Sequence, residues 1–96
     1  MRNRYIVCYD IRDPKRLRAI YKIMRGYGDP LQYSVFICNL SSTEYELMIN
    51  DLEEEINHHT DSIIIINMGS IDSEKADNIR FMGQRTYFQD RDVIIV

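Results

Sequence analysis

The alternation of apolar and polar stretches along the chain predicts strands at its beginning and in its second half. Residues 5–9 are all apolar or aromatic, and Asp10 ends the run. A run that is apolar on both faces is typical of a central strand, so we expect a strand over residues 3–10 and another over 62–68. Asp10 then lies where the first strand leaves the sheet, at an edge where ligands and metals collect.

A first helix is expected directly after this strand. Asp13 is a favourable N-cap, and Pro14 suits the first helical position because its missing N–H is not needed there. The residues that recur at helical spacing and form the expected core stripe are Leu17, Ile20, Tyr21 and Met24. The turn formers in residues 26–30 end the helix.

The pattern of residues in the middle of the chain predicts further strand structure and a second helix. Residues 31–40 are either one strand bent near Ser34 or two short strands, and the pattern leaves both open. A helix then starts at 41–43, where Thr43 and Glu46 fit a capping box. Its buried stripe is Tyr45, Met48, Ile49, Leu52 and Ile56, and its outer face carries Glu44, Asp51, Glu54 and Glu55. The pair His58 and His59 is expected to close it.

The last residues add smaller elements. We expect a short helical turn at 73–77, a short strand at 79–82, and a strand at 92–96 that must be paired because exposed apolar edges aggregate. Together these elements predict one domain, residues 1–96, of the α+β class. Its architecture is a ferredoxin-like two-layer sandwich with an extra C-terminal strand at about 93–96. A second subunit covering the bare, apolar sheet face predicts a homodimer.

Charge is distributed unevenly, which changes the picture of possible partners. The chain has a formal net charge of −3. Residues 1–28 nevertheless hold eight basic and two acidic side chains, whereas the rest holds four basic and thirteen acidic ones. Lys15, Arg18, Lys22 and Arg25 are spaced to form one stripe on the first helix, which we call the basic stripe. Such a face suits an anionic partner, and an ordinary solvated helix surface is the alternative.

The apolar runs, the first residues and the two cysteines indicate the cellular location and the state of the thiols. No apolar run approaches the roughly 18 residues of a membrane helix. Residues 1–4 lead directly into a strand without a signal-peptide pattern, so we expect a cytoplasmic protein without membrane contact. Cys8 and Cys38 lie in apolar runs and are expected to be buried thiols.

The candidate chemistry centres on Asp10. Mg²⁺ prefers oxygen ligands and needs one or two carboxylates when a phosphate completes its shell, so Asp10 is a candidate ligand. Alternatively Asp10 accepts hydrogen bonds at the start of the first helix. Tyr9 is a candidate for stacking or packing, and Ser34 for positioning a phosphate or a water. The candidate phosphate contacts are Arg12, Lys15, Arg16, Arg18, Lys22 and Arg25.

Several of these stretches together are similar to a known family. Tyr9-Asp10-Ile11, the segment 16–18 (Arg-Leu-Arg), Tyr27-Gly28, and residues 32–36 (Gln-Tyr-Ser-Val-Phe) resemble the CRISPR-associated endoribonuclease family. This family is the smaller of the two universal spacer-acquisition proteins, and the resemblance covers nearly the whole chain. The sequence departs from it at Pro30, where many members carry arginine, and at Ile37, where many carry glutamate.

The resemblance implies a homodimer with two copies of Asp10 facing each other across a cleft. It implies a catalytic Asp10 that binds Mg²⁺, with Mn²⁺ as the alternative metal, and cleavage of single-stranded RNA or duplex DNA. It also implies a role as an adaptor between CRISPR integrase dimers. Three hypotheses therefore stay open: a metal-dependent endonuclease, a non-catalytic DNA-binding adaptor, and a ferredoxin-like regulatory or toxin-type dimer.

Overall fold

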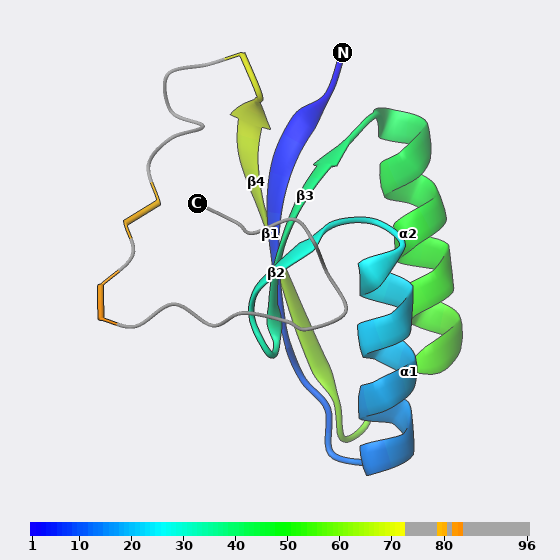
Figure 1. The fold of residues 1–96 in the computed structure, drawn as a ribbon. Coiled ribbons are helices and arrows are strands. Elements are labelled where there is room, and N and C mark those ends of the chain that lie inside the picture. The colour runs from blue at the N-terminus through cyan, green and yellow to red at the C-terminus, as the bar shows by residue number, and fades with distance from the viewer. Residues whose placement is uncertain (73–78, 81, 84–96) are drawn as a thin grey trace.

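The fold is an antiparallel sheet with two helices packed on one of its faces (Figure 1). The computed structural model describes residues 1–72, 79–80 and 82–83. Along the chain the elements are β1 (Asn3–Asp10), α1 (Pro14–Arg25), β2 (Asp29–Gln32), β3 (Val35–Leu40), α2 (Ser42–Glu55) and β4 (Ser62–Ser70). The sheet order is β2-β3-β1-β4. This β1-α1-β2-β3-α2-β4 arrangement confirms the predicted ferredoxin-like α+β sandwich.

Strand β1 is central, as predicted, and its side chains alternate between the two sheet faces. Tyr5, Val7 and Tyr9 are buried on the face that the helices cover. Cys8 and Asp10 belong to the opposite face, where Cys8 pairs in register with Ile64 and Asp10 with Ser62. The alternation follows from the pleat of the strand, and it places Asp10 on the open face of the sheet.

Helix α1 begins as the sequence predicts. The Asp13 carboxylate accepts a hydrogen bond from the Arg16 backbone N–H at 2.9 Å, and Pro14 occupies the first turn. Ile20 and Met24 are fully buried. Leu17, which was expected in the core stripe, is 40% exposed instead. The prediction for Leu17 is wrong because the helix turns its side chain toward a groove described below rather than toward the sheet.

The hairpin after α1 depends on a close backbone approach at Gly28. A Cβ atom at this position would lie 2.3 Å from the Ile37 carbonyl oxygen, so a side chain cannot fit without moving β3. Residues 31–40 form parts of two strands, β2 and β3, which meet in a turn at Tyr33 and Ser34. The alternative of two short strands is therefore correct, and β2 already begins at Asp29 within the predicted turn segment.

Helix α2 starts within the predicted segment 41–43, but its capping pair differs from the predicted one and it ends earlier than predicted. The capping box is formed by Ser41 and Glu44 rather than by Thr43 and Glu46. Two spacings fitted the motif, and Ser41 is the residue with the extended backbone that a cap requires. The helix ends at Glu55, so His58 and His59 lie in the following turn and do not close it.

Strand β4 was predicted to be central but lies at an edge of the sheet that the described residues form, beside β1. Ile64 and Ile66 on its open face are 60% and 47% exposed. Hydrophobicity on both faces of a strand does not show whether the strand has neighbours on both sides within the sheet or lies at its edge.

The predicted elements of the last residues are only partly described. The predicted turn at 73–77 and the predicted C-terminal strand at 92–96 lie outside the described residues. Of the predicted strand at 79–82, the described residues 79, 80 and 82 have irregular backbone.

Candidate nucleic-acid site at the end of β1

Asp10 is an exposed carboxylate at the point where β1 leaves the sheet. Its partner in the sheet is Ser62, the first residue of β4. The preceding residue, Tyr9, points to the other face and packs against Phe36, with ring centroids 6.2 Å apart. The prediction that Tyr9 has a buried packing role is consistent with this geometry. Burial raises the pKa of the Tyr9 hydroxyl to about 12, with a smaller contribution from nearby Tyr21.

The turn between β2 and β3 is attached to β1 next to Asp10. The Tyr9 hydroxyl donates a hydrogen bond to the Tyr33 carbonyl at 3.0 Å, and the Tyr9 backbone N–H donates to the Ser34 carbonyl at 3.1 Å. The fold thus brings Ser34 next to Tyr9 and Asp10, from which it is distant in the sequence.

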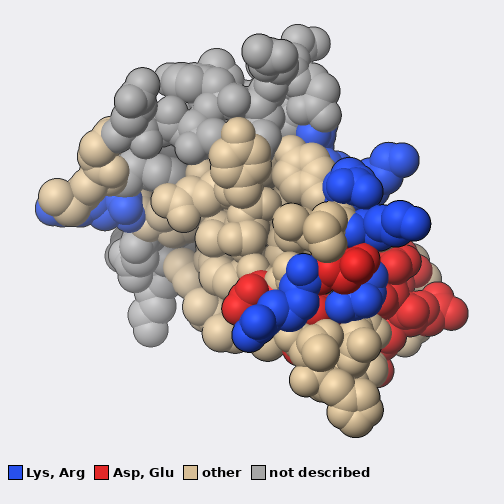
Figure 2. All heavy atoms as spheres, turned by 90° about the horizontal axis from the view of Figure 1, so that it is seen from below, with Lys and Arg blue, Asp and Glu red and all other residues tan. Residues whose placement is uncertain are grey.

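A groove of about 960 Å³ lies between this turn and α1, and we call it the Asp10 groove. Its lining includes Asp10, Ser34 and Tyr33 from the sheet and Lys15, Arg18 and Lys22 from α1. The three cations are exposed, so their charges face solvent at the groove. Figure 2 shows that Lys and Arg side chains gather along one side of this end of the molecule, next to a region of Asp and Glu.

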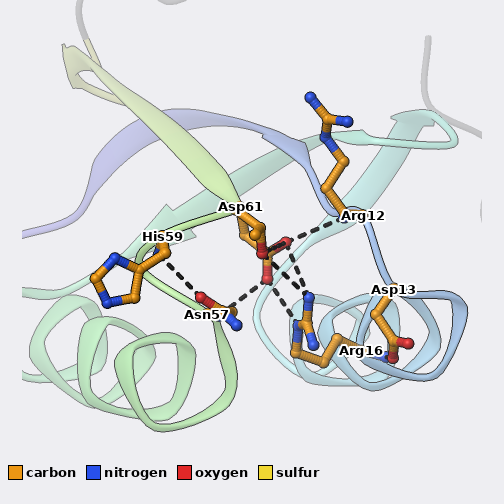
Figure 3. A network of polar contacts seen from close by, with 7 residues as sticks. Arg12, Asp13, Arg16, Asn57, His59 and Asp61 are labelled. Atoms are coloured by element: carbon orange, nitrogen blue, oxygen red, sulfur yellow. Dashed lines mark hydrogen bonds and ion pairs between the residues drawn. The ribbon is translucent and has the colours of Figure 1, made fainter.

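Of the three other predicted phosphate contacts, Arg12 and Arg25 differ from each other in environment. Arg12 is exposed, and its side chain points away from the neighbouring polar network (Figure 3). Arg25, the last member of the basic stripe, is half-buried, with its guanidinium carbon 5.8 Å from the centre of the Tyr21 ring. Arg25 therefore lies against an aromatic side chain at the far end of the helix.

Arg16 is engaged inside the protein. Its guanidinium donates to both carboxylate oxygens of Asp61, at 2.8 and 3.3 Å, and the Asp61 side chain is fully buried (Figure 3). Asp61 also accepts hydrogen bonds from the backbone N–H groups of Arg12 and Asn57, at 3.0 and 2.9 Å. The hydrogen bond from Arg16 holds the pKa of the Asp61 carboxyl well below its usual range, and the two backbone donors act in the same direction.

Sequence reasoning identified neither Asp61 nor the ion pair that Arg16 forms with it. The two residues are far apart in the sequence, and no local spacing motif connects a residue before β4 with the first turn of α1. Because the guanidinium is bound to Asp61, the contacts proposed below use the other cations. Within the described residues, no three His, Cys, Asp or Glu side chains are grouped as a metal site.

The donor type at Asp10 nevertheless suits a hard divalent cation. A carboxylate oxygen is a preferred ligand of Mg²⁺, which is commonly held by one or two carboxylates together with substrate phosphates. The exposure of Asp10 leaves its oxygens accessible to a metal and to a second carboxylate from another molecule.

Comparison with known proteins identifies the family. The pattern of the family described as CRISPR associated protein Cas2 matches residues 3–76, which include all six helices and strands of the described residues. The chain belongs to the Cas2 family. None of the helices in the described residues is long and apolar enough to cross a lipid bilayer.

Several relatives support this assignment. A protein named CRISPR-associated endoribonuclease Cas2 1 from Rhodospirillum rubrum is 43% identical over 65 residues, covering 68% of this chain and 64% of that protein. The match thus spans slightly less than two thirds of that relative. CRISPR-associated endoribonuclease Cas2 from Geobacter sulfurreducens is 39% identical over 75 residues, covering 78% of this chain and 79% of that protein.

Solved structures agree with the fold. The crystal structure of Streptococcus pyogenes Cas2 at pH 6.5 has a TM-score of 0.74 and 29% identity, and covers 83% of this chain and 99% of that one. The structure of the hypothetical protein TT1823 from Thermus thermophilus has a TM-score of 0.77 at 22% identity, covering 91% of this chain and 98% of that one. Its low identity makes it a comparison of fold alone.

Proposed function

We propose that this Cas2 family member is a metal-dependent endonuclease that acts in CRISPR spacer acquisition, with Asp10 as its catalytic residue. The observation that carries the proposal is the position of Asp10. Asp10 is exposed at the end of the central strand, and it is part of the lining of a groove that three exposed cations also border. The relatives are named endoribonucleases, which supports RNA as a substrate. Duplex DNA is the second substrate class.

The basic side chains bind the substrate backbone in this proposal. Lys15, Arg18 and Lys22 line the same groove as Asp10, so a phosphate chain bound along α1 would pass the end of β1, where Asp10 lies. Arg12 and Arg25 extend the same contact at either end of the helix. Such contacts neutralise phosphates without reading sequence, and they weaken as salt concentration rises.

Asp10 and its copy in a second molecule would hold Mg²⁺, or Mn²⁺ as the alternative. The metal supplies a water of lowered pKa and stabilises charge on the phosphate. Asp10 itself contributes negatively charged oxygen ligands at a fixed position, because β1 is hydrogen-bonded on both sides. Ser34 lines the same groove and can orient a phosphate or a water through its hydroxyl.

The proposal is tested by cleavage of labelled RNA and duplex DNA with and without Mg²⁺ or Mn²⁺. We expect Asp10→Asn to lower the metal-dependent rate by about 100-fold or more, since metal-ion catalysis contributes several kcal/mol. The amide keeps the size of the side chain but removes its charge, so folding is preserved at this exposed position.

Glu53→Gln is the matched control, because it removes an exposed carboxylate from the outer surface of α2. It should cleave at the wild-type rate. Metal-dependent activity that persists in Asp10→Asn at equal purity would refute the catalytic role of Asp10.

The second candidate function is a non-catalytic adaptor that binds duplex DNA and a CRISPR integrase subunit. It is favoured by the row of exposed cations on α1, which needs no cleavage chemistry to bind phosphates. Wild type and Asp10→Asn that bind duplex DNA equally well, with no cleavage in either, would support this function. We place either activity in the cytoplasm, without membrane contact.

Both functions require the homodimer, which we propose forms through the open sheet face. Ile64 is 60% exposed and Ile66 is 47% exposed on this face, beside Asp10 on β1. A second copy packed there removes the apolar surface from water and brings a second Asp10 toward the first.

Ile64→Asp should therefore weaken the dimer by introducing an unpaired charge into the interface. Sedimentation velocity at micromolar concentration should show dimeric wild type and a variant shifted toward the monomer. Leu47→Ala, at a 52% exposed position on α2, is the control and should remain dimeric. A monomeric wild-type protein would contradict the proposal.

A further inference from the structure

The Asp10 groove has an aromatic and apolar wall that the proposed cleavage does not use. Tyr33, in the turn between β2 and β3, is 75% exposed and lines the groove. Leu17 lines it from α1 and is 40% exposed, although the helical pattern predicts a core position. Two large apolar surfaces thus face solvent in the same cavity as the cations.

The position of Tyr33 is determined by the core of the protein. Its carbonyl accepts the hydrogen bond from the Tyr9 hydroxyl, and the next carbonyl, that of Ser34, accepts one from the Tyr9 backbone. Tyr9 is only 6% exposed and its ring stacks on Phe36. A turn held by two hydrogen bonds to a central strand presents its aromatic side chain with a small loss of entropy on binding.

Charge and size restrict what can occupy the groove. Lys15, Arg18 and Lys22 make its helical side positive, which favours an anionic ligand. Its volume of about 960 Å³ lies at the upper end of the range for small-molecule sites. An aromatic ring beside a row of cations is the combination that binds single-stranded nucleic acid, in which a base stacks while the backbone follows the charges.

We propose that the Asp10 groove binds an unpaired base of a single-stranded nucleic acid, stacked on Tyr33 and bordered by Leu17. The adjoining phosphates contact Lys15, Arg18 and Lys22. The inference rests on the proposed function, because a base stacked on Tyr33 would place the neighbouring phosphates of the nucleic acid close to Asp10. It makes the groove selective for single strands, since the bases of a duplex are already stacked and paired.

Binding without metal tests the inference separately from cleavage. With a chelator present, the affinity of the protein is measured for oligothymidylate and for an abasic single strand of equal length and charge. We expect wild type to bind the base-containing strand about 10-fold more tightly, from base–aromatic stacking. Tyr33→Ala should reduce this ratio to about one, and Tyr33→Phe should keep it because the ring remains.

Three controls assign the effect to the base. Leu47→Ala, at an exposed position on α2 that does not line the groove, should leave the ratio unchanged. Lys22→Ala should weaken the binding of both strands similarly and reduce its salt dependence, since it removes a phosphate contact. Duplex DNA should bind wild type and Tyr33→Ala with equal affinity.

Each other pattern overturns the inference. A ratio of one in wild type shows that the groove binds phosphates alone, which leaves the nuclease proposal to its own cleavage test. A ratio unchanged in Tyr33→Ala shows that the base is bound elsewhere. Failure of wild type to bind any single strand refutes both base stacking and the proposed backbone contacts with a single strand, whatever the cleavage assay shows.

Discussion

Replacing Phe36 with alanine should destabilise the protein by about 3–5 kcal/mol, the usual cost of removing a buried phenylalanine ring. Phe36 on β3 is fully buried. Its ring stacks on Tyr9 and meets Tyr21 edge to face, with centroids 5.4 Å apart. The substitution therefore opens a cavity between the sheet and α1, directly behind the wall of the Asp10 groove.

Urea unfolding monitored by circular dichroism measures this effect. Small domains have total stabilities of about 5–15 kcal/mol, so the variant should lose a large share and its midpoint should fall steeply. Leu47→Ala truncates an exposed apolar side chain and should change stability by less than about 0.5 kcal/mol. A Phe36→Ala midpoint equal to that of wild type would mean that the core does not close around this ring.

The second large effect is expected for Asp61→Asn. The amide has nearly the same shape, but it loses the charge that pairs with Arg16 and one of the two equivalent acceptor oxygens. The backbone N–H groups of Arg12 and Asn57, which donate to the two carboxylate oxygens, cannot both keep their acceptors. Because the carboxylate is fully buried, water cannot replace it, and we expect the melting temperature at pH 7 to fall by about 5 °C or more.

The pH dependence separates the charge of Asp61 from its size. Its pKa in the folded protein lies well below the unfolded value of about 3.9, chiefly through the hydrogen bond from Arg16. A lowered folded pKa means that the carboxylate stabilises the fold at pH above the unfolded pKa. This contribution is lost as the pH falls from about 5 toward the lower folded value.

The difference in melting temperature between wild type and Asp61→Asn should therefore shrink as the pH is lowered from 7 toward about 2. Glu44→Gln is the comparison, since it breaks the exposed ion pair with Arg2 and should cost less at pH 7. A difference for Asp61→Asn that does not change with pH would assign the effect to shape alone.

Features governed by neighbouring residues were predicted well from the sequence. Strand β1, the cap at Asp13 with Pro14, and the buried positions Ile20 and Met24 all follow from local patterns. The order of elements also led to the correct sandwich. At the site, Asp10 and the exposed cations of α1 were identified in advance, although their catalytic and binding roles remain predictions.

Features set by distant contacts were not predictable in this way. The edge position of β4 depends on which strand pairs beside it, and a local pattern does not contain that information. The bond between Arg16 and Asp61 joins the start of α1 to the residue before β4. The groove wall formed by Tyr33 and Leu17 exists only once the hairpin has folded beside the helix.

The alternation of side chains along β1 has a consequence for insertions and deletions. Tyr5, Val7 and Tyr9 face the helices while Asp10 faces outward, so the two sets are separated by odd and even position. Deleting one residue before Tyr9 would exchange the sets for the shifted part of the strand, which would direct the carboxylate under the helices and an aromatic ring outward. Within this strand, the number of residues therefore determines which face of the sheet each side chain occupies.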